Sequence, residues 1–120
     1  MSTIKVDTIK NTSNVEVFTA KAWVNFNGSG TVAIRASGNV SSITDNGTGD
    51  YTVNFTNSMS DADYVVNANS TSDSGGWTGQ ANVQPKADVT RVVSSTRVVT
   101  SNTLNAVLYD FSQIYITIFR

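Results

Sequence analysis

Short runs in which apolar and polar residues alternate recur along most of the chain, with turn-forming residues between them. Such alternation indicates strands with one buried face. In the segment from Ala22 to Phe55, for example, Val24 and Phe26 share one face, and residues 27–30 (NGSG) then have the composition of a hairpin turn. The strands expected from this pattern are residues 22–26, 31–37, 40–44, 51–55, 64–69, 80–84, 89–93, 97–100, 105–111 and 113–119.

Two of the expected strands differ in how regularly they alternate. Residues 31–37 are expected to turn Val32, Ile34 and Ala36 inward. Residues 40–44 break strict alternation, which predicts a β-bulge or an edge position there. Strands that recur at this spacing favour a sandwich or a barrel.

The last expected strand, residues 113–119, is apolar on both faces. A strand of this kind lies either in the middle of a layered fold or at an interface between subunits. Trp23 also lies opposite the inward face of its own run, so it belongs either to a second buried face or to an interface. The candidate residues for a subunit interface are Trp23, Ile114, Ile116, Ile118 and Phe119.

Residues 2–19 alternate in two pieces, which the turn-forming residues 11–14 separate. They form either two short strands of the same domain or an arm that becomes ordered against a partner. We therefore divide the chain into residues 1–19, an N-terminal arm or first strands, and residues 20–120, a head domain. The expected fold is all-β: an antiparallel, jelly-roll-like β-sandwich knob with a short N-terminal arm.

Composition excludes several classes of chemistry. Cysteine and histidine are absent, which removes disulfides, the usual zinc sites and the catalytic pairs and triads that need them. Residues 45–50 (DNGTGD) superficially resemble a calcium loop, but Asp50 and Thr56 stand where the EF-hand pattern needs glycine and glutamate. We expect no enzyme activity, no metal and no cofactor.

Charge and hydropathy also limit the partners. The chain has 8 Lys and Arg against 9 Asp and Glu, so it lacks the basic surface that nucleic acids need. No apolar run approaches the length of a membrane-spanning helix, about 20 residues, so no membrane insertion is expected. The first ten residues lack the apolar core of a secretory signal, which favours synthesis and assembly in a cytoplasm.

One loop carries an isolated aromatic residue. Trp77 lies in the polar stretch of residues 70–79, STSDSGGWTG. An exposed indole stacks on a sugar face or anchors a protein contact, whereas a structural one folds back over the rim of the sandwich. The candidate glycan-contact residues are Trp77, Ser74, Gly76 and Thr78, with Trp23 and Tyr51 as lesser candidates.

Residues 20–55, AKAWVNFNGSGTVAIRASGNVSSITDNGTGDYTVNF, closely resemble a segment of bacteriophage tail-fibre and related virion proteins, notably those of marine cyanophages. The opening STIKVDTIK and the ending IYITIFR are similar to the two ends of such proteins. The resemblance implies a virion structural protein on the tail or capsid surface, assembled in the host cytoplasm. Such proteins are usually homotrimeric fibres or knobs and often contact the host surface.

The same resemblance suggests how the parts would work. Ile4, Val6 and Ile9 become candidate anchor residues that attach the chain to other virion proteins. Fibre proteins of this kind are often longer, with a shaft between the anchor and the head, and here the arm runs almost directly into the head. That difference favours a short fibre or knob-like appendage. The alternatives are a capsid or tail decoration protein without a receptor, and an adhesin that binds a host surface glycan.

Overall fold

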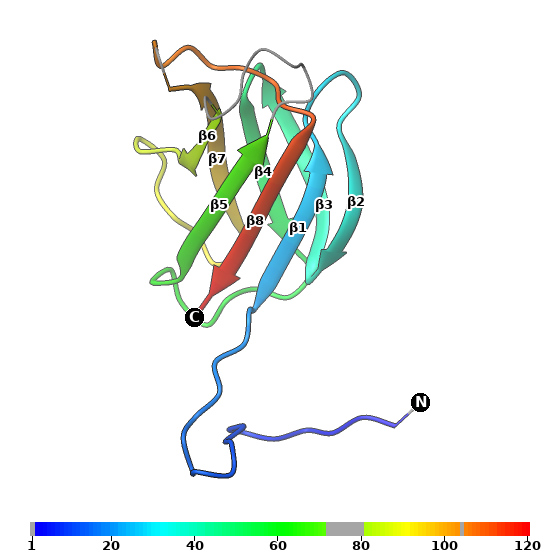
Figure 1. Cartoon of the computed structure of the whole chain (residues 1–120), viewed down its shortest axis with the longest axis vertical. Coiled ribbons are helices and arrows are strands. Elements are labelled where there is room, and N and C mark those ends of the chain that lie inside the picture. The colour runs from blue at the N-terminus through cyan, green and yellow to red at the C-terminus, as the bar shows by residue number, and fades with distance from the viewer. Residues whose placement is uncertain (1, 72–80, 104) are drawn as a thin grey trace.

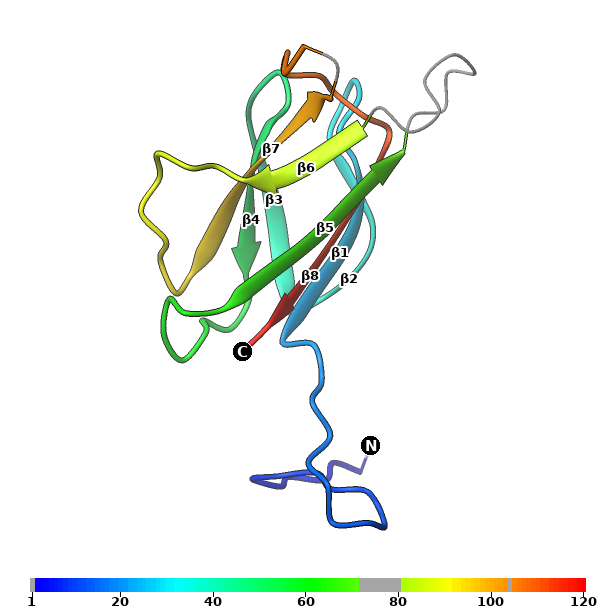
Figure 2. The same cartoon turned by 60° about the vertical axis from the view of Figure 1, so that its left-hand side comes forward.

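Two antiparallel four-stranded sheets pack face to face, and an N-terminal arm projects below them (Figures 1 and 2). This computed structural model describes residues 2–71, 81–103 and 105–120 of the chain. The strands are β1 (Ala22–Asn27), β2 (Ala33–Gly38), β3 (Val40–Gly47), β4 (Asp50–Phe55), β5 (Val65–Thr71), β6 (Ala81–Pro85), β7 (Ser95–Asn102) and β8 (Gln113–Phe119).

The first sheet has the strand order β2-β1-β8-β5, and the second has the order β3-β4-β7-β6. Every pair of neighbouring strands is antiparallel. The prediction of an all-β antiparallel sandwich is therefore confirmed.

A single apolar core fills the space between the sheets. Alternate side chains of β1, β4 and β8 point into it, as the alternation in the sequence predicts. Its members are Ala22, Val24, Phe26, Val40, Tyr51, Val53, Phe55, Met59, Tyr64, Val83, Val98, Phe111, Ile114, Ile116 and Ile118. Burying one large apolar side chain contributes about 1.5–3 kcal/mol, so this cluster is the main source of stability.

Tyr51 joins the core to the upper end of the sandwich. Its ring packs edge-on against Phe26, with ring centroids 5.3 Å apart. Its hydroxyl oxygen lies 2.8 Å from the carbonyl oxygen of Gly28 and 2.6 Å from Oδ1 of Asp110, and its one proton is shared between them. The amide of Gly49 donates to the same Oδ1 at 2.7 Å. The hydroxyl group of Tyr51 and the carboxylate of Asp110 therefore connect the β1–β2 loop, the β3–β4 turn and the segment before β8.

Asn39 makes a comparable joint at the lower end, in the turn between β2 and β3. Its φ of 55° lies in the left-handed region, which asparagine tolerates better than most residues. Its side-chain amide donates to the carbonyl oxygens of Lys21 (2.9 Å) and Asn57 (3.0 Å), and its Oδ1 accepts from the amide of Asn57 (2.7 Å). The base of the arm is thus fixed to the second sheet.

Two expected strands are loops with one isolated bridge each. Residues 89–93 belong to the connection between β6 and β7, which runs along one side of the sandwich (Figures 1 and 2), and they form a β-bridge only at Val92 with Ser95. The guanidinium of Arg91 explains this path, because it donates to the carbonyl oxygen of Tyr64 at 2.6 Å and lies over its ring. Residues 105–111 likewise form a β-bridge only at Leu108 with Ser101.

A bulge in β2 corrects the predicted faces of that strand. Asn25 of β1 pairs with Ala36 and Phe26 pairs with Ile34, so Arg35 is the extra residue between them. Ala36 therefore faces the opposite side of the sheet from Ile34, although we expected both to point inward. The irregularity expected in residues 40–44 is confirmed, because β3 is an edge strand with two register shifts.

Candidate interaction surfaces

The N-terminal arm folds back on itself as a short hairpin below the sandwich (Figure 1). The amide of Val17 donates to the carbonyl oxygen of Ile9 at 2.7 Å, and the amide of Asn11 donates to that of Val15 at 2.9 Å. The side chain of Asn11 also accepts from the amide of Ser13, which stabilises the turn. The two short strands expected as one option for the arm are absent from its described residues, and the arm contains a single isolated β-bridge, between Lys10 and Glu16. The arm is thus a separate feature and not a pair of strands in either sheet.

The apolar side chains of the arm are exposed. The candidate anchor residues Ile4, Val6 and Ile9 are 88%, 57% and 51% exposed, and Val15, Val17 and Phe18 are exposed as well. The arm also carries Lys5, Asp7, Lys10 and Glu16, so its basic and acidic side chains balance. A stretch with no net charge and this much exposed apolar surface is typical of a segment that packs against another surface.

The arm and the end of β8 enclose a groove of about 440 Å³. Its apolar lining includes Val6, Ile9, Phe18 and Phe119, and Arg120 lies at its edge. The exposed apolar surface of the arm is therefore continuous with the C-terminal end of the first sheet.

An ion pair holds the last residue of the chain in place beside this groove. The guanidinium of Arg120 donates to both carboxylate oxygens of Asp61, at 2.7 and 2.6 Å. These hydrogen bonds, with that from the amide of Asp63, lower the pKa of Asp61 to about 2. Both partners are accessible to solvent, so water and salt screen the pair.

The Asp61–Arg120 pair predicts a small stability difference that depends on pH. Because the folded-state pKa of Asp61 lies below the unfolded value of about 3.9, the pair stabilises the fold above that pH and is lost as the pH falls towards 2. We expect Asp61→Asn to lower the urea midpoint at pH 7 and to match the parent chain near pH 2. Arg120→Lys keeps the charge without the bidentate geometry, so its urea midpoint at pH 7 should lie between those of the parent chain and Asp61→Asn. An equal difference at both pH values would contradict this assignment.

The outer face of the first sheet carries a second group of exposed apolar side chains. Cross-strand pairing places Trp23 beside Thr117 and Tyr115 beside Asn25 on this face. The exposed fractions of Trp23, Tyr115, Phe119 and Val65 are 44%, 37%, 38% and 60%. The indole of Trp23 covers Gly38, where a Cβ atom would collide with it. Asn67 and Asn69 of β5 lie on the same face, so aromatic rings alternate with side-chain amides.

The structure divides the candidate interface residues into two groups. Ile114, Ile116 and Ile118 are at most 2% exposed, because they point between the two sheets of the same chain. The expectation that they line a subunit interface is therefore wrong, and they are core residues. Trp23 and Phe119 lie on the opposite, outer face and stay candidates for a subunit contact.

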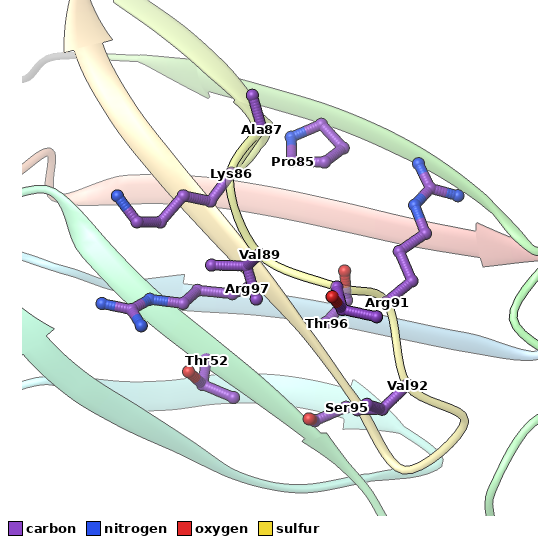
Figure 3. Close-up of a pocket in the computed structure, with 11 residues that line it drawn as sticks. Thr52, Pro85, Lys86, Ala87, Val89, Arg91, Val92, Ser95, Thr96 and Arg97 are labelled. Atoms are coloured by element: carbon purple, nitrogen blue, oxygen red, sulfur yellow. The ribbon is translucent and has the colours of Figure 1, made fainter.

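The groove on the outer face of the second sheet has a mixed lining, in which three cationic side chains and several hydroxyl groups lie among the apolar residues Pro85, Ala87, Val89 and Val92 (Figure 3). Its three cationic residues are already engaged. Arg97 donates to both carboxylate oxygens of Asp50, at 2.7 and 2.8 Å, which lowers the pKa of that carboxyl group. Lys86 lies 3.4 Å from Asp88, and Arg91 bonds the carbonyl group of Tyr64. These cations therefore serve the fold, and the groove is a poor candidate for an anion site.

The loop predicted to contact glycans, with Trp77, Ser74, Gly76 and Thr78, lies outside the described residues. Tyr51, a lesser candidate for the same role, is fully buried in the core and is not available to a ligand. Trp23 is the glycan candidate that the structure places at the surface. Within the residues that the structure describes, no cluster of three or more side chains could hold a metal ion.

The alternation pattern did not identify three exposed residues as candidates for contacts: Tyr115 and Val65 on the outer face of the first sheet, and Phe18 in the arm. Alternation gave a usable signal for Tyr115, since it lies on the face of its strand opposite Ile114 and Ile116. The pattern could not indicate which face of residues 113–119 is exposed, because both faces of that strand are apolar.

Comparisons with known proteins give no relative: no family model, no curated protein and no solved structure matches the chain. The described residues contain no helix long and apolar enough to cross a membrane.

Proposed function

We propose that this chain is a structural protein of a bacteriophage virion, a short tail fibre or knob-like appendage in which the β-sandwich is displayed and the arm attaches it. The observation that carries the proposal is the arm, whose exposed apolar residues lie outside both sheets. The resemblance of residues 20–55 to tail-fibre and related virion proteins gives the class of particle. The exposed apolar side chains on the outer face of the first sheet, Trp23 and Phe119 among them, offer a further surface for contacts in such an assembly.

The proposed assembly is a homotrimer that binds other virion proteins through Ile4, Val6 and Ile9. Three copies would bring together apolar surface that is left open in one copy, namely the arm and the outer-face residues Trp23 and Phe119. A decoration or cementing protein on the capsid or tail uses the same arm without a receptor. Immunogold electron microscopy of virions distinguishes these positions, because a fibre labels the tail tip and a decoration protein labels the capsid or tail side.

Deleting residues 2–18 tests the role of the arm. The first strand begins at Ala22 and the core contains no arm residue, so the shortened chain should keep its β-sheet circular dichroism spectrum and cooperative unfolding. It should be absent from purified virions, whereas the full chain is present. As a matched control, Lys5→Ser and Asp7→Ser together should be incorporated normally. Normal incorporation of the deleted chain would remove the attachment role.

A glycan-binding adhesin is the second candidate, and the outer face of the first sheet favours it. Aromatic rings with side-chain amides between them suit the apolar faces and the hydroxyl groups of sugars. We expect Trp23→Ala to weaken binding to a host envelope glycan about tenfold. Trp23→Phe, which keeps a ring, should retain most of it. If the unmodified protein binds nothing on an array of host envelope glycans, this candidate is rejected.

A further inference from the structure

Each sheet has two edge strands, and three of these four edges carry features that hinder pairing with another strand. β2 has a bulge and the charged residue Arg35, and β3 has two register shifts. β6 ends in Pro85, which has no amide to donate to another strand. Bulges, charges, short length and proline are the usual means by which proteins keep sheet edges from pairing.

The fourth edge strand, β5, has none of these features. Its seven residues, VVNANST, contain no charge and no proline. They pair with β8 without any register shift, from Val65 opposite Phe119 to Thr71 opposite Gln113. An edge that is uncharged and has no bulge is a ready template for another strand.

The hydrogen bonds show which groups of β5 face away from β8. The amide of Ser70 donates to the side-chain Oδ1 of Asn69 at 2.9 Å, so it points to the open side. Since successive amides of a strand point to opposite edges, those of Val66 and Ala68 point to the open side as well. Within the described residues, the backbone hydrogen bonds of β5 all belong to its pairing with β8.

The arm holds a segment that matches this edge. Residues 3–9 form seven consecutive positions, the length of β5, and contain no proline. Ile4 and Val6 would lie on the side of Val66 and Ala68, which pack at the margin of the core. Lys5 and Asp7 would then lie on the outer, solvent side.

We infer that residues 3–9 of one copy add to the open edge of β5 in a second copy, as an extra strand of the first sheet. Within one chain, the first described residues of the arm lie below the sandwich and away from β5 in both views of the molecule (Figures 1 and 2). A contact between the arm of one copy and a different surface of the next is heterologous. Such contacts form a closed ring, for example a trimer, when the rotation from each copy to the next adds up to a full turn. The inference rests on the self-assembly in the proposed function and names the segment and the edge that make it. It takes Ile4 and Val6 out of the virion anchor, whereas Ile9, on the outer side with Lys5 and Asp7, stays available to other virion proteins.

Disulfide trapping tests the contact directly, because the chain has no cysteine of its own. One preparation carries Val6→Cys and the other carries Ala68→Cys, and the two are mixed and oxidised. We expect a covalent dimer with one chain of each kind, twice 12.8 kDa by mass spectrometry. Dimers of Val6→Cys with itself alone would mean that arms pair with arms and would overturn the inference. In a chain that carries both cysteines, a disulfide formed only within one chain would show that the arm reaches β5 of its own copy. That result would also overturn the inference.

Blocking the edge gives an independent measurement in solution. Ala68→Pro removes an amide that faces the open side, where proline is tolerated in an edge strand. Sedimentation should show self-association weakened about a hundredfold, with a β-sheet spectrum and cooperative unfolding retained. The matched control Ala68→Ser keeps the amide and should associate like the parent chain.

Val6→Pro in the exposed arm should have the same effect and cannot disturb the core, so it settles the outcome if Ala68→Pro does not fold. Oligomers that persist in folded Ala68→Pro or in Val6→Pro would reject the β5 contact and leave the virion role standing. A parent chain that is monomeric at micromolar concentration would reject the contact together with the trimer. Incorporation into virions, measured separately, would then still decide the virion role.

Discussion

Gly49→Ala is expected to destabilise the sandwich by about 3 kcal/mol or more, a large part of the 5–15 kcal/mol that is typical of a whole domain. Two effects add at this position. The φ of Gly49 is +61°, in the left-handed region where a side chain causes strain. A Cβ atom there would lie 2.5 Å from the carbonyl oxygen of Thr100 and 2.7 Å from the amide nitrogen of Tyr109.

The backbone around Gly49 has little freedom to move away from that Cβ atom. Its carbonyl oxygen accepts from the amide of Thr100 at 2.8 Å, and its own amide donates to Asp110. The amide of Tyr109 in turn donates to the carbonyl oxygen of Thr100 at 3.0 Å. Relieving the collision therefore breaks hydrogen bonds that hold β7 and the segment before β8 against the turn between β3 and β4.

Gly30→Ala is the matched control, because it separates strain from collision. Gly30 has a similar φ of +66°, but no atom lies within 4 Å of the added Cβ position. It should cost about 1 kcal/mol, and the difference between the two variants measures the collision. Urea denaturation of both chains gives the two free energies of unfolding. Equal losses would show that the contacts around Gly49 yield easily.

Tyr51→Phe is expected to cost about 2–3 kcal/mol, although it removes a single oxygen atom. The hydroxyl group is buried and bonds a carboxylate, and hydrogen bonds to charged groups are the stronger kind. Without it, Asp110 loses one of the donors that hold it at the end of the core. Burial, with the neighbouring Asp110, raises the pKa of Tyr51, so the hydroxyl group stays a donor across the ordinary pH range.

Tyr64→Phe is the control for that measurement. The hydroxyl group of Tyr64 is shared between two neutral carbonyl groups, those of Val92 (3.0 Å) and Ser95 (2.9 Å). Its removal should cost about 1 kcal/mol. Thermal unfolding of the two variants side by side compares charged with neutral acceptors in one fold. A larger loss for Tyr64→Phe would contradict the role given to Asp110.

The sequence predicted the strands best where large apolar residues occupy every second position without a break. The runs at residues 22–26, 51–55 and 113–119 correspond to β1, β4 and β8, and their alternating residues form the core. It failed at residues 89–93, where Val92 and Val93 are exposed. A hydrogen bond and a ring contact made by Arg91 fix that loop, and both are made to Tyr64, which is distant in the sequence.

The candidate surfaces were predictable only in part, for a related reason. Alternation marked residues 2–19 as capable of forming strands, but it cannot indicate whether a partner strand exists in the same chain. It also marked both faces of residues 113–119 as apolar. Only the packing of Ile116 against the second sheet, with Tyr115 directed outward, decides which face is left open.

The arm and the C-terminus leave the sandwich at the same end, and this has a practical consequence for using the protein as a carrier. β1 starts beside the end of β8, so a tag fused after Arg120 would emerge next to the arm (Figure 1). A peptide inserted at Gly30, in the loop between β1 and β2, would emerge at the opposite end, where the added Cβ position meets no atom. Foreign epitopes grafted there would be presented outward while the arm is left unaltered.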